Sequence, residues 1–294
     1  MGPPRIHVTG AVPAAITSAL AESFAIVERP ADADGILALI STRVDDAYLA
    51  AAGPQLRIVA NYGVGVDNVD LAAAASRGIT VTNTPDVLTE TTAELAIALT
   101  LALLRRVAEG DRFLRARKPW GFGLEFMLGE GMRGKRFAVV GAGRIGRATA
   151  KLAEALGADP SFVGRGELEQ ALPSADIVSI HCPLTPATRH LIDAKVLALL
   201  RPSAILVNTA RGPIVDEQAL VDALREERLA GAALDVFEHE PRVAEELLTF
   251  ENVVLTPHLG SATRSTREAM GLSAVGALRA QLLEGREPPN TVGT

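Results

Sequence analysis

The stretch Phe137-Ala138-Val139-Val140-Gly141-Ala142-Gly143-Arg144-Ile145-Gly146 decides the fold of this chain. An apolar run that suits a buried strand leads directly into a glycine-rich turn, and apolar periodicity then predicts a helix. In this context Gly141 permits the tight turn, Gly143 lets a pyrophosphate approach the backbone, and Gly146 lets helix and strand pack closely. Free N–H groups at the helix start favour phosphate there. The stretch predicts a dinucleotide-binding unit, and a glycine-rich turn that binds nothing is the alternative.

Strands and helices alternate on both sides of this stretch. Apolar runs that suit buried strands are residues 6–9, 25–28, 36–40, 56–60 and 79–83 before it, and 137–140, 161–164, 176–180, 205–208, 232–236 and 253–256 from it onward. Short helical segments such as 45–52 and 70–77 lie between them. Because such alternation implies parallel sheets with covered faces, we predict an α/β fold of two doubly wound parallel-sheet units in sequence.

The segment between the two units begins with a helix pattern. Thr91 and Glu94 fit a capping box, which predicts a long apolar helix from there to about Glu109. We expect it to link the domains and to form part of a dimer interface, and a plain core helix is the alternative. Residues 113–134 are predicted to be irregular. The last helix, 266–283, is long enough to return and pack on the first unit.

Two connections are too short for the usual crossover helix. About seven residues join the strands at 25–28 and 36–40, whereas a helical parallel crossover takes at least about ten to twelve. No helix is expected there. The link from Arg165 to Asp176 has room for only one short helical stretch, 167–172.

The end of the second strand of the coenzyme unit bears on which dinucleotide is bound. For NAD a carboxylate should stand about 20 residues after the glycine turn and accept a hydrogen bond from the ribose 2′-hydroxyl. That strand ends in Val163-Gly164-Arg165, and Asp159 precedes the strand at the wrong end. A glycine followed by a guanidinium leaves space and positive charge for a 2′-phosphate. The pattern favours NADPH, with NAD still possible; a solvated, unused Arg165 is the alternative.

Composition excludes several classes of protein. The chain has 294 residues and a mass of 30.8 kDa, room for two domains at roughly 150 residues each. Its one cysteine, Cys182, gives neither an internal disulfide nor a metal cluster. A net charge of −6 without a basic stripe argues against a nucleic-acid partner. The longest apolar run, 95–104, is about half a membrane span, and the first residues have no targeting pattern. We expect a cytoplasmic protein with no membrane segment.

Three polar stretches follow strands on the side where open α/β sheets bind ligands. They are residues 208–212, 235–241 and 256–261. Reduction of a ketone needs a hydride, a proton for the oxygen and a group that polarises the carbonyl. A histidine beside a carboxylate suits the proton, and an arginine suits the carbonyl because it stays charged. We assign His258 as the acid/base, Glu240 as its partner and Arg211 as the clamp, although each alone has an ordinary surface explanation.

Together with the glycine turn, these stretches resemble the D-isomer-specific 2-hydroxyacid dehydrogenases. The resemblance covers almost the whole chain and is carried by residues 61–70, 82–85, 141–146, 181–186, 208–212 and 256–261. It implies a Rossmann coenzyme domain at 93–264, inserted into a flavodoxin-like substrate domain made of 1–92 and 265–294. The family's catalytic arginine, glutamate and histidine fall on Arg211, Glu240 and His258.

The resemblance also implies how ligands are bound. Backbone N–H groups of Val64 and Gly65 would hold the substrate carboxylate, together with Arg211 and His258. Residues that would line the cofactor, beside Gly141, Gly143, Gly146, Gly164 and Arg165, are Arg144, Ile145, Cys182, Thr209, Asp235 and Gly260. Asp235 would lie near the nicotinamide amide, and His181 is interpreted as structural. Trp120 falls where some members close the partner subunit's site, although plain interface packing would also explain it.

The expected function is reduction of a small 2-keto acid, glyoxylate or hydroxypyruvate, to the D-2-hydroxy acid with NADPH, by a homodimer. Alternatives are a phosphoglycerate-type NAD-dependent dehydrogenase, a dinucleotide-sensing protein similar to the family's co-repressors, and a trimmed relative that binds cofactor poorly. The chain departs from the family in its two short connections, where members carry a helix and, in the second, also an extra strand. We expect this loss to expose apolar sheet edge and to remove part of the adenosine pocket wall.

Overall fold

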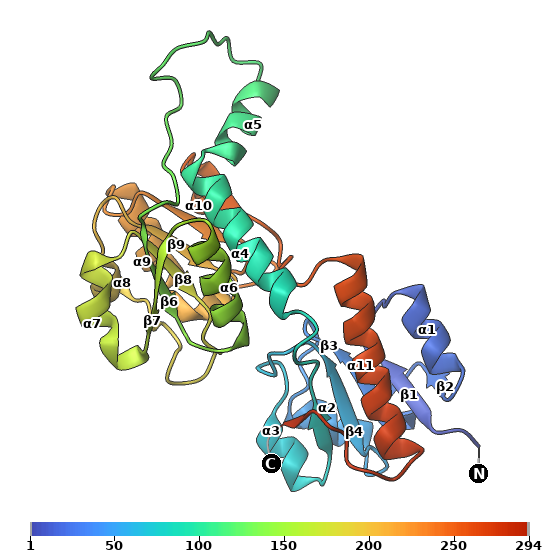
Figure 1. Cartoon of the computed structure of the whole chain (residues 1–294). Coiled ribbons are helices and arrows are strands. Elements are labelled where there is room, and N and C mark those ends of the chain that lie inside the picture. The colour runs from blue at the N-terminus through green and yellow to red at the C-terminus, as the bar shows by residue number, and fades with distance from the viewer. Residues whose placement is uncertain (1, 293–294) are drawn as a thin grey trace. The chain divides into compact units, whose positions relative to one another are not determined.

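The computed structural model describes residues 2–292 and divides into two α/β units (Figure 1). One unit consists of residues 1–88 and 261–294, and the other of residues 89–260. These boundaries fall a few residues before those that the sequence analysis places at 92 and 264. All the predicted strands form, and their ends differ from the prediction by at most two residues. No helix within residues 2–292 has the length and apolar character needed to cross a membrane.

The first unit is built on a six-stranded sheet with the order β2-β1-β3-β4-β5-β12. Its parallel strands are β1 (Arg5–Val8), β2 (Ala25–Val27), β3 (Gly35–Leu39), β4 (Ile58–Tyr62) and β5 (Thr80–Thr82). This order of the first five strands is flavodoxin-like, as expected. The short β12 (Thr291–Val292) pairs antiparallel with β5 and was not predicted, because two residues carry no strand pattern.

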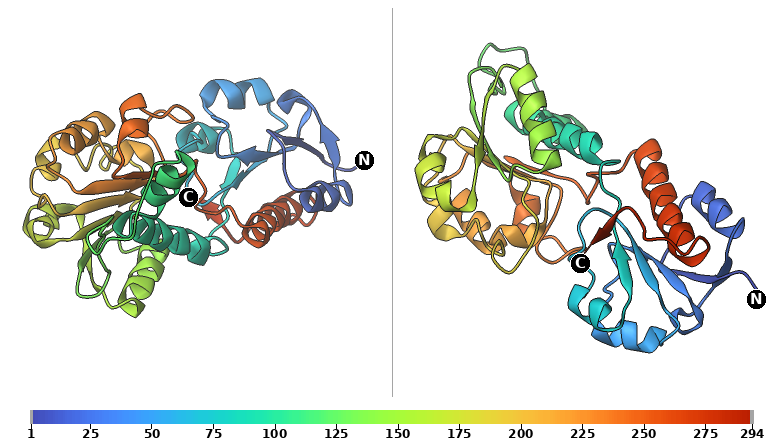
Figure 2. Two further views of the ribbon diagram at one scale, coloured as in Figure 1. Left: turned by 90° about the horizontal axis from the view of Figure 1, so that it is seen from above. Right: turned by 60° about the horizontal axis from the view of Figure 1, so that its bottom comes forward.

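Helices cover both faces of this sheet (Figure 2). On one face α11 (Arg264–Leu282) packs on β3 and β4 and against α1 (Ala14–Ala21), so the end of the chain returns to the first unit as predicted. On the other face α2 (Asp46–Ala52) and α3 (Leu71–Ser76) bury a core that includes Ile36, Leu49 and Val59. Asp45 and Asp70 accept hydrogen bonds from backbone N–H groups and cap these two helices.

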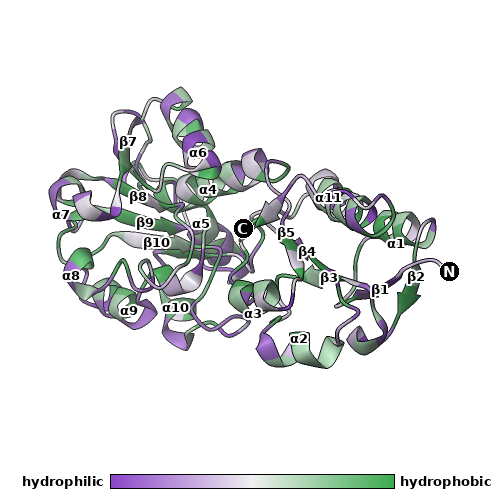
Figure 3. Ribbon diagram, turned by 90° about the horizontal axis from the view of Figure 1, so that it is seen from below, coloured by the Kyte–Doolittle hydropathy of each residue, from purple (hydrophilic) through white to green (hydrophobic). Residues whose placement is uncertain are grey.

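The second unit has a fully parallel six-stranded sheet with the order β7-β6-β8-β9-β10-β11. Its strands are β6 (Arg136–Val140), β7 (Asp159–Val163), β8 (Ile177–Ile180), β9 (Ile205–Asn208), β10 (Gly231–Leu234) and β11 (Val253–Leu255). Phe137 and Val139 of β6 face the helices α4 (Thr89–Leu104) and α6 (Arg144–Ala155). Ala138 and Val140 belong to the core on the opposite face. Burial on both faces explains why this strand reads as a continuous apolar run. Figure 3 shows the neighbouring strand β8 mostly in the green of hydrophobic residues.

The opposite face of this sheet is covered by shorter helices. They are α7 (Leu168–Ala171), α8 (Ala194–Leu197), α9 (Glu217–Arg225) and α10 (Glu245–Thr249). Leu197, Leu220 and Leu247 from three of these helices enter the same core as Val178 and Leu206 of the sheet. The polar loops that follow β9, β10 and β11 are therefore held by a continuous apolar layer.

The helix at the start of this unit differs from the prediction. It begins at Thr89, so Thr91 lies inside the helix, and the predicted capping box does not form. It ends at Leu104 instead of near Glu109, and Arg106 takes a left-handed conformation (φ 54°) before α5 (Val107–Arg115). The physical reason is distant in sequence: the N–H of Glu130 donates to the Leu104 carbonyl (2.8 Å) and ends the helix there.

Helix α5 and the segment 116–131 form an arm that extends from the body of the second unit (Figure 1). The irregular structure predicted for 113–134 is confirmed from residue 116 onward, whereas 113–115 still belong to α5. Several large apolar side chains of the arm are exposed: Val107, Leu114, Trp120, Phe122, Leu124, Phe126 and Leu128. Trp120 stacks on Phe126 with ring centroids 6.3 Å apart, and Phe113 meets Phe126 edge-on.

Both short connections lack a full crossover helix, as predicted. The link between β2 and β3 contains only the 3₁₀ turn η1 (Pro30–Asp32). The link after β7 contains η2 (Arg165–Glu167), α7 and η3 (Leu172–Ser174). The usual dinucleotide-binding order 3-2-1-4-5-6 has a further strand outside strand 2, but here β7 is the edge. Ile26 on β2 and Phe162 on β7 are 47% and 44% exposed, so the expected exposure of apolar sheet edge is confirmed.

Candidate active site

The turn between β6 and α6 requires glycine at two positions. Gly141 has a φ of 108°, and a Cβ there would lie 2.7 Å from the backbone nitrogen of Cys182. A Cβ on Gly146 would lie 2.2 Å from the carbonyl oxygen of Gly141, so α6 could not pack as closely on the strand. Both contacts are with backbone, which cannot move aside as a side chain does. The roles that the sequence analysis gave to these two glycines match the geometry.

The third glycine of the turn leaves space for a ligand. Gly143 is the N-cap residue of α6, has no side chain to cap the helix, and has no atom within 4 Å of the position where its Cβ would be. The first N–H groups of the twelve-residue helix, with Arg144 and Ile145 at its start, therefore face an open cradle. Such a cradle suits a dinucleotide pyrophosphate, whose approach a Cβ at Gly143 would obstruct.

The residues directly after β8, His181 and Cys182, pack against this turn. The ring nitrogen Nε2 of His181 lies 2.8 Å from the Ser179 hydroxyl, and desolvation of the ring lowers the pKa of His181 to about 4. His181 is therefore neutral near pH 7, in keeping with a structural role. Burial raises the pKa of the neighbouring Cys182 thiol, which remains protonated under the same conditions.

A cavity of about 310 Å³ lies beside the turn, entirely within the second unit. Four of the residues predicted to bind cofactor line it: Gly141, Gly164, Arg165 and Cys182. Arg165 is exposed, and its guanidinium donates to the Ala187 carbonyl (3.4 Å). The cavity opens at the carboxyl end of β7, where dinucleotide-binding sheets place the adenosine ribose.

The same cavity contains an acid that the sequence analysis missed. The N–H of Gly164 donates to Oε2 of Glu167 (2.7 Å), and Glu167 also lines the cavity. The end of the strand itself carries no acid, as the sequence analysis states, but the prediction overlooked Glu167. Glu167 comes three residues after the strand end, and the 3₁₀ turn η2 brings its side chain back to Gly164. Gly-x-x-Glu directly after a strand was the pattern that could have revealed it.

The buried carboxylate of Asp235, directly after β10, binds the loop that carries His258. Its Oδ1 accepts hydrogen bonds from the Thr256 hydroxyl (2.6 Å) and the Leu259 N–H (2.7 Å), and its Oδ2 accepts one from the Gly260 N–H (2.8 Å). Burial raises the pKa of Asp235, and these three bonds act in the opposite direction. The N–H of His258 also donates to the Asp235 carbonyl (2.8 Å), which fixes the backbone of the histidine.

The histidine and glutamate predicted to act together are hydrogen-bonded. Nδ1 of His258 lies 2.9 Å from Oε2 of Glu240, and Oε1 of Glu240 accepts the N–H of Phe237 (3.0 Å). Partial burial works to raise the pKa of Glu240, but the bond to His258, the charges nearby and the Phe237 N–H outweigh it and lower the pKa. The carboxylate of Glu240 is thus ionised at neutral pH.

Arg211 lies in the loop next to this pair. A Cβ on Gly212 would lie 1.9 Å from the Phe237 carbonyl carbon, so the loop after β9 is pressed against the backbone that leads to Glu240. The Asn208 side chain donates to the Arg211 carbonyl (2.9 Å), and the charge of Arg211 contributes to the lowered pKa of Glu240. The hydroxyl of Thr209, in the same loop, is buried and has no hydrogen-bond partner within residues 2–292. The structure brings all three predicted catalytic side chains to adjacent loops.

Val64 and Gly65 lie in the first unit, in the loop after β4. The amide groups of Asn83 and Asn61 donate to the Val64 carbonyl (2.9 Å) and the Gly65 carbonyl (2.8 Å). The N–H groups of Val64 and Gly65 have no partner in the described part of the chain. This loop is thus held by its carbonyls with two donors unused, an arrangement that suits an anion.

Comparison with known proteins shows which family the chain is similar to. The sequence model of the D-isomer specific 2-hydroxyacid dehydrogenase, NAD binding domain, matches residues 97–260. The chain is 43% identical over 285 residues to a glyoxylate reductase of Thermococcus litoralis, covering 91% of this chain and 86% of the relative. It is 48% identical over 246 residues to a glyoxylate/hydroxypyruvate reductase of Arabidopsis thaliana, covering 80% and 78%.

Solved structures are similar over nearly the full length. An NADPH-dependent glyoxylate/hydroxypyruvate reductase of Sinorhizobium meliloti, in complex with NADP and malonate, has a TM-score of 0.89 and 37% identity, covering 99% of this chain and 97% of that one. A protein of Thermus thermophilus has a TM-score of 0.90 and 42% identity, covering 98% and 99%.

The two glycines that flank Arg144 and Ile145 should respond differently to the same substitution. Gly146→Ala places a methyl group against the Gly141 carbonyl and should lower the free energy of unfolding by about 1–3 kcal/mol. In Gly143→Ala the added methyl group meets no other atom, and the backbone φ at this position is an ordinary one. The free energy of unfolding of this variant should therefore stay within about 0.5 kcal/mol of that of the parent. Urea unfolding followed by circular dichroism measures both. Equal stabilities of the two variants would contradict the close approach of α6 and β6.

Proposed function

The chain belongs to the D-isomer-specific 2-hydroxyacid dehydrogenases, and on this basis we propose that it reduces a small 2-keto acid, glyoxylate or hydroxypyruvate, to the D-2-hydroxy acid with NADPH. It is an oxidoreductase that binds a nicotinamide dinucleotide. The observation that carries the proposal is the 2.9 Å hydrogen bond between His258 and the ionised Glu240, in loops next to Arg211. Relatives described as glyoxylate or hydroxypyruvate reductases support the substrate class.

The residues around the β6–α6 turn would hold the cofactor. The pyrophosphate would lie on Gly141, Gly143, Arg144, Ile145 and Gly146, and the adenosine end at Gly164, Arg165 and Cys182. The nicotinamide end would lie by Thr209, Asp235 and Gly260, where the unpartnered Thr209 hydroxyl can bond to a ligand. When bound, the reduced nicotinamide supplies the hydride for the carbonyl carbon.

The protein's own residues handle the carboxylate and the proton. The N–H groups of Val64 and Gly65 would bind the substrate carboxylate, and Arg211 would polarise the keto oxygen. Because Glu240 engages Nδ1 of His258, Nε2 is the atom that would donate the proton to that oxygen. The hydride and this proton together convert C=O to CH–OH. In the reverse direction the same imidazole would accept the proton.

Removal of the proton donor should abolish most of the turnover. His258→Gln should lower kcat for glyoxylate or hydroxypyruvate by about 100-fold or more, while cofactor affinity changes little. Glu240→Gln should lower kcat by less, because a glutamine oxygen can still accept a hydrogen bond from Nδ1 of His258 and keep the ring oriented. Steady-state kinetics from pH 5 to 9 measures both effects, and His239→Gln, at the residue next to Glu240, is the control. Turnover by His258→Gln close to that of the parent would refute the role of His258.

The preference for NADPH rests on Arg165. Its exposed guanidinium at the carboxyl end of β7 can pair with a 2′-phosphate, and the similar Sinorhizobium enzyme is described as NADPH-dependent. Arg165→Asp should weaken NADPH binding by roughly 10- to 100-fold and spare NADH. Arg228→Asp, which changes the net charge equally away from the cavity, controls for general electrostatic attraction. If Arg165→Asp leaves the Kd values for NADPH and NADH unchanged, Arg165 does not determine the cofactor preference.

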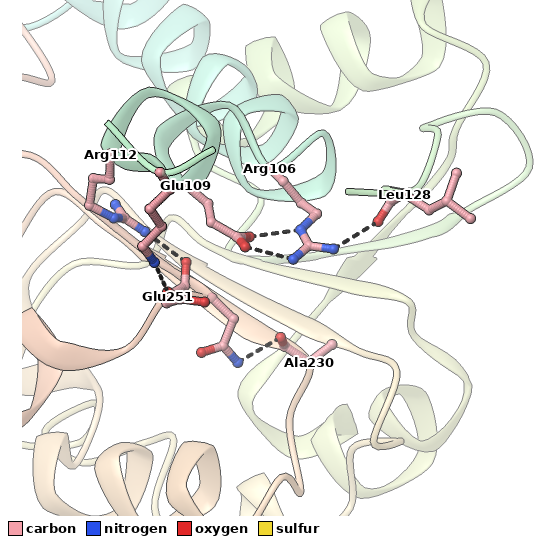
Figure 4. Close-up of polar contacts among 8 residues, drawn as sticks. Arg106, Glu109, Arg112, Leu128, Ala230 and Glu251 are labelled. Atoms are coloured by element: carbon pink, nitrogen blue, oxygen red, sulfur yellow. Dashed lines mark hydrogen bonds and ion pairs between the residues drawn. The ribbon is translucent and has the colours of Figure 1, made fainter. Parts of the chain in front are cut away.

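A second copy of this chain is the proposed partner of the arm. The base of the arm is fixed by polar contacts (Figure 4). Arg106 pairs with Glu109 (2.6 Å) and donates to the Leu128 carbonyl (3.3 Å). Arg112 donates to the Glu251 carbonyl (2.7 Å). These bonds hold the exposed apolar side chains away from the core of their own unit. Because a monomer rarely exposes so large an apolar patch, the arm fits an interface between two identical subunits. Trp120 would then lie at or near the partner's site. A cytoplasmic location stays a prediction.

Disruption of the arm should change the oligomeric state. The double variant Phe122→Asp, Leu124→Asp should elute as a monomer of about 31 kDa with the helical content of the parent, whereas the parent should elute at twice that mass. Leu156→Asp, an exposed leucine outside the arm, should remain dimeric. Size-exclusion chromatography with light scattering measures the masses. A monomeric parent protein would contradict the proposal.

A further inference from the structure

We propose that Glu167 is a second determinant of cofactor choice, which opposes Arg165 and lowers the affinity of the cavity for a 2′-phosphate. The proposal rests on the binding of a nicotinamide dinucleotide by the β6–α6 turn. It assigns a role to an acid that lies beside the ribose position but not at the strand end, where this fold usually carries one.

The position of Glu167 is fixed by two hydrogen bonds. Its backbone N–H donates to the Gly164 carbonyl (3.0 Å) and closes the turn η2, and its Oε2 accepts the Gly164 N–H (2.7 Å). The carboxylate therefore lies over the carboxyl end of β7. Both Gly164 and Glu167 line the cavity that Arg165 also lines.

This arrangement suits a ribose with a free 2′-hydroxyl. Oε1 of Glu167 has no partner within residues 2–292, so it can accept a hydrogen bond from that hydroxyl while Oε2 keeps its bond to Gly164. An acid that accepts from the 2′-hydroxyl is the feature by which dinucleotide folds select NADH. NADH would thus bind without a change in the Glu167 side chain.

A 2′-phosphate meets two obstacles at the same place. It carries a negative charge of about −1.5 to −2 and would approach the carboxylate of Glu167, so the two like charges would repel each other. It would also compete for the Gly164 N–H, a donor that suits a phosphate oxygen but is already engaged. To accept NADPH, the site must break the Gly164–Glu167 bond and turn the side chain outward, after which Arg165 and the freed N–H both face the phosphate.

A purely structural role as the cap of η2 is the competing explanation. In that case the loss of Glu167 would lower stability and change the affinities for both cofactors alike. Two variants separate charge from hydrogen bonding: Glu167→Gln keeps an acceptor for the Gly164 N–H but removes the charge, and Glu167→Ala removes both. Glu169→Gln changes the same charge on the exposed surface of α7, outside the cavity, and is the matched control.

The test compares the Kd of NADPH with that of NADH by isothermal titration calorimetry, without substrate. Glu167→Gln should bind NADPH about fivefold more tightly than the parent, as expected for one exposed like-charge contact, and Glu167→Ala more tightly still. NADH should bind equally or up to a few times more weakly. The increase in NADPH affinity of the Glu167 variants over the parent should be smaller at about 0.3 M salt than at low salt, because salt screens exposed charges. Glu169→Gln should match the parent.

An unchanged ratio of the two Kd values in both Glu167 variants overturns the proposal, and so does a parent protein that binds neither cofactor. Because these measurements involve no turnover, a failed 2-keto acid assignment would leave them intact. If Arg165→Asp leaves the ratio unchanged while Glu167→Gln shifts it, the role of Arg165 is lost and that of Glu167 stands.

Discussion

The carboxylate of Asp235 positions the loop after β11, which carries His258. It is fully buried, and it gathers the Thr256 hydroxyl and two consecutive N–H groups of the following loop onto the end of β10. A buried carboxylate is costly unless it is fully hydrogen-bonded, so the loop has one favourable position. That position presents His258 to Glu240, whose other oxygen is held by the Phe237 backbone. The hydrogen bonds that the buried Asp235 carboxylate accepts thus bring the acid–base pair together.

The features that sequence analysis predicted well depend on short-range rules. Gly141 and Gly146 are required by a backbone contact within a few residues of the turn, and strand ends in a parallel sheet meet on one side, which places Arg211, Glu240 and His258 on neighbouring loops. The features that it missed depend on contacts across the sequence. The end of α4 at Leu104 is set by Glu130, and no local pattern contains that bond.

Glu167 was not predicted for a different reason. The usual acid stands at the end of the strand itself, whereas the 3₁₀ turn η2 here brings back to Gly164 an acid from three positions later. The short link that replaces the usual crossover is what makes this return tight. The short link and the acid that was not predicted therefore lie in the same stretch of chain, directly after β7.

The guanidinium of Arg147 lies over the ring of Phe162, 5.1 Å from its centroid, on the edge strand β7. A cation held on an aromatic ring keeps water and charge at an edge whose unpaired backbone could otherwise add a strand from another molecule. Natural sheets use such charged gatekeepers to suppress aggregation. Arg147 on α6 therefore discourages the exposed edge of β7 from pairing with a strand of a second molecule.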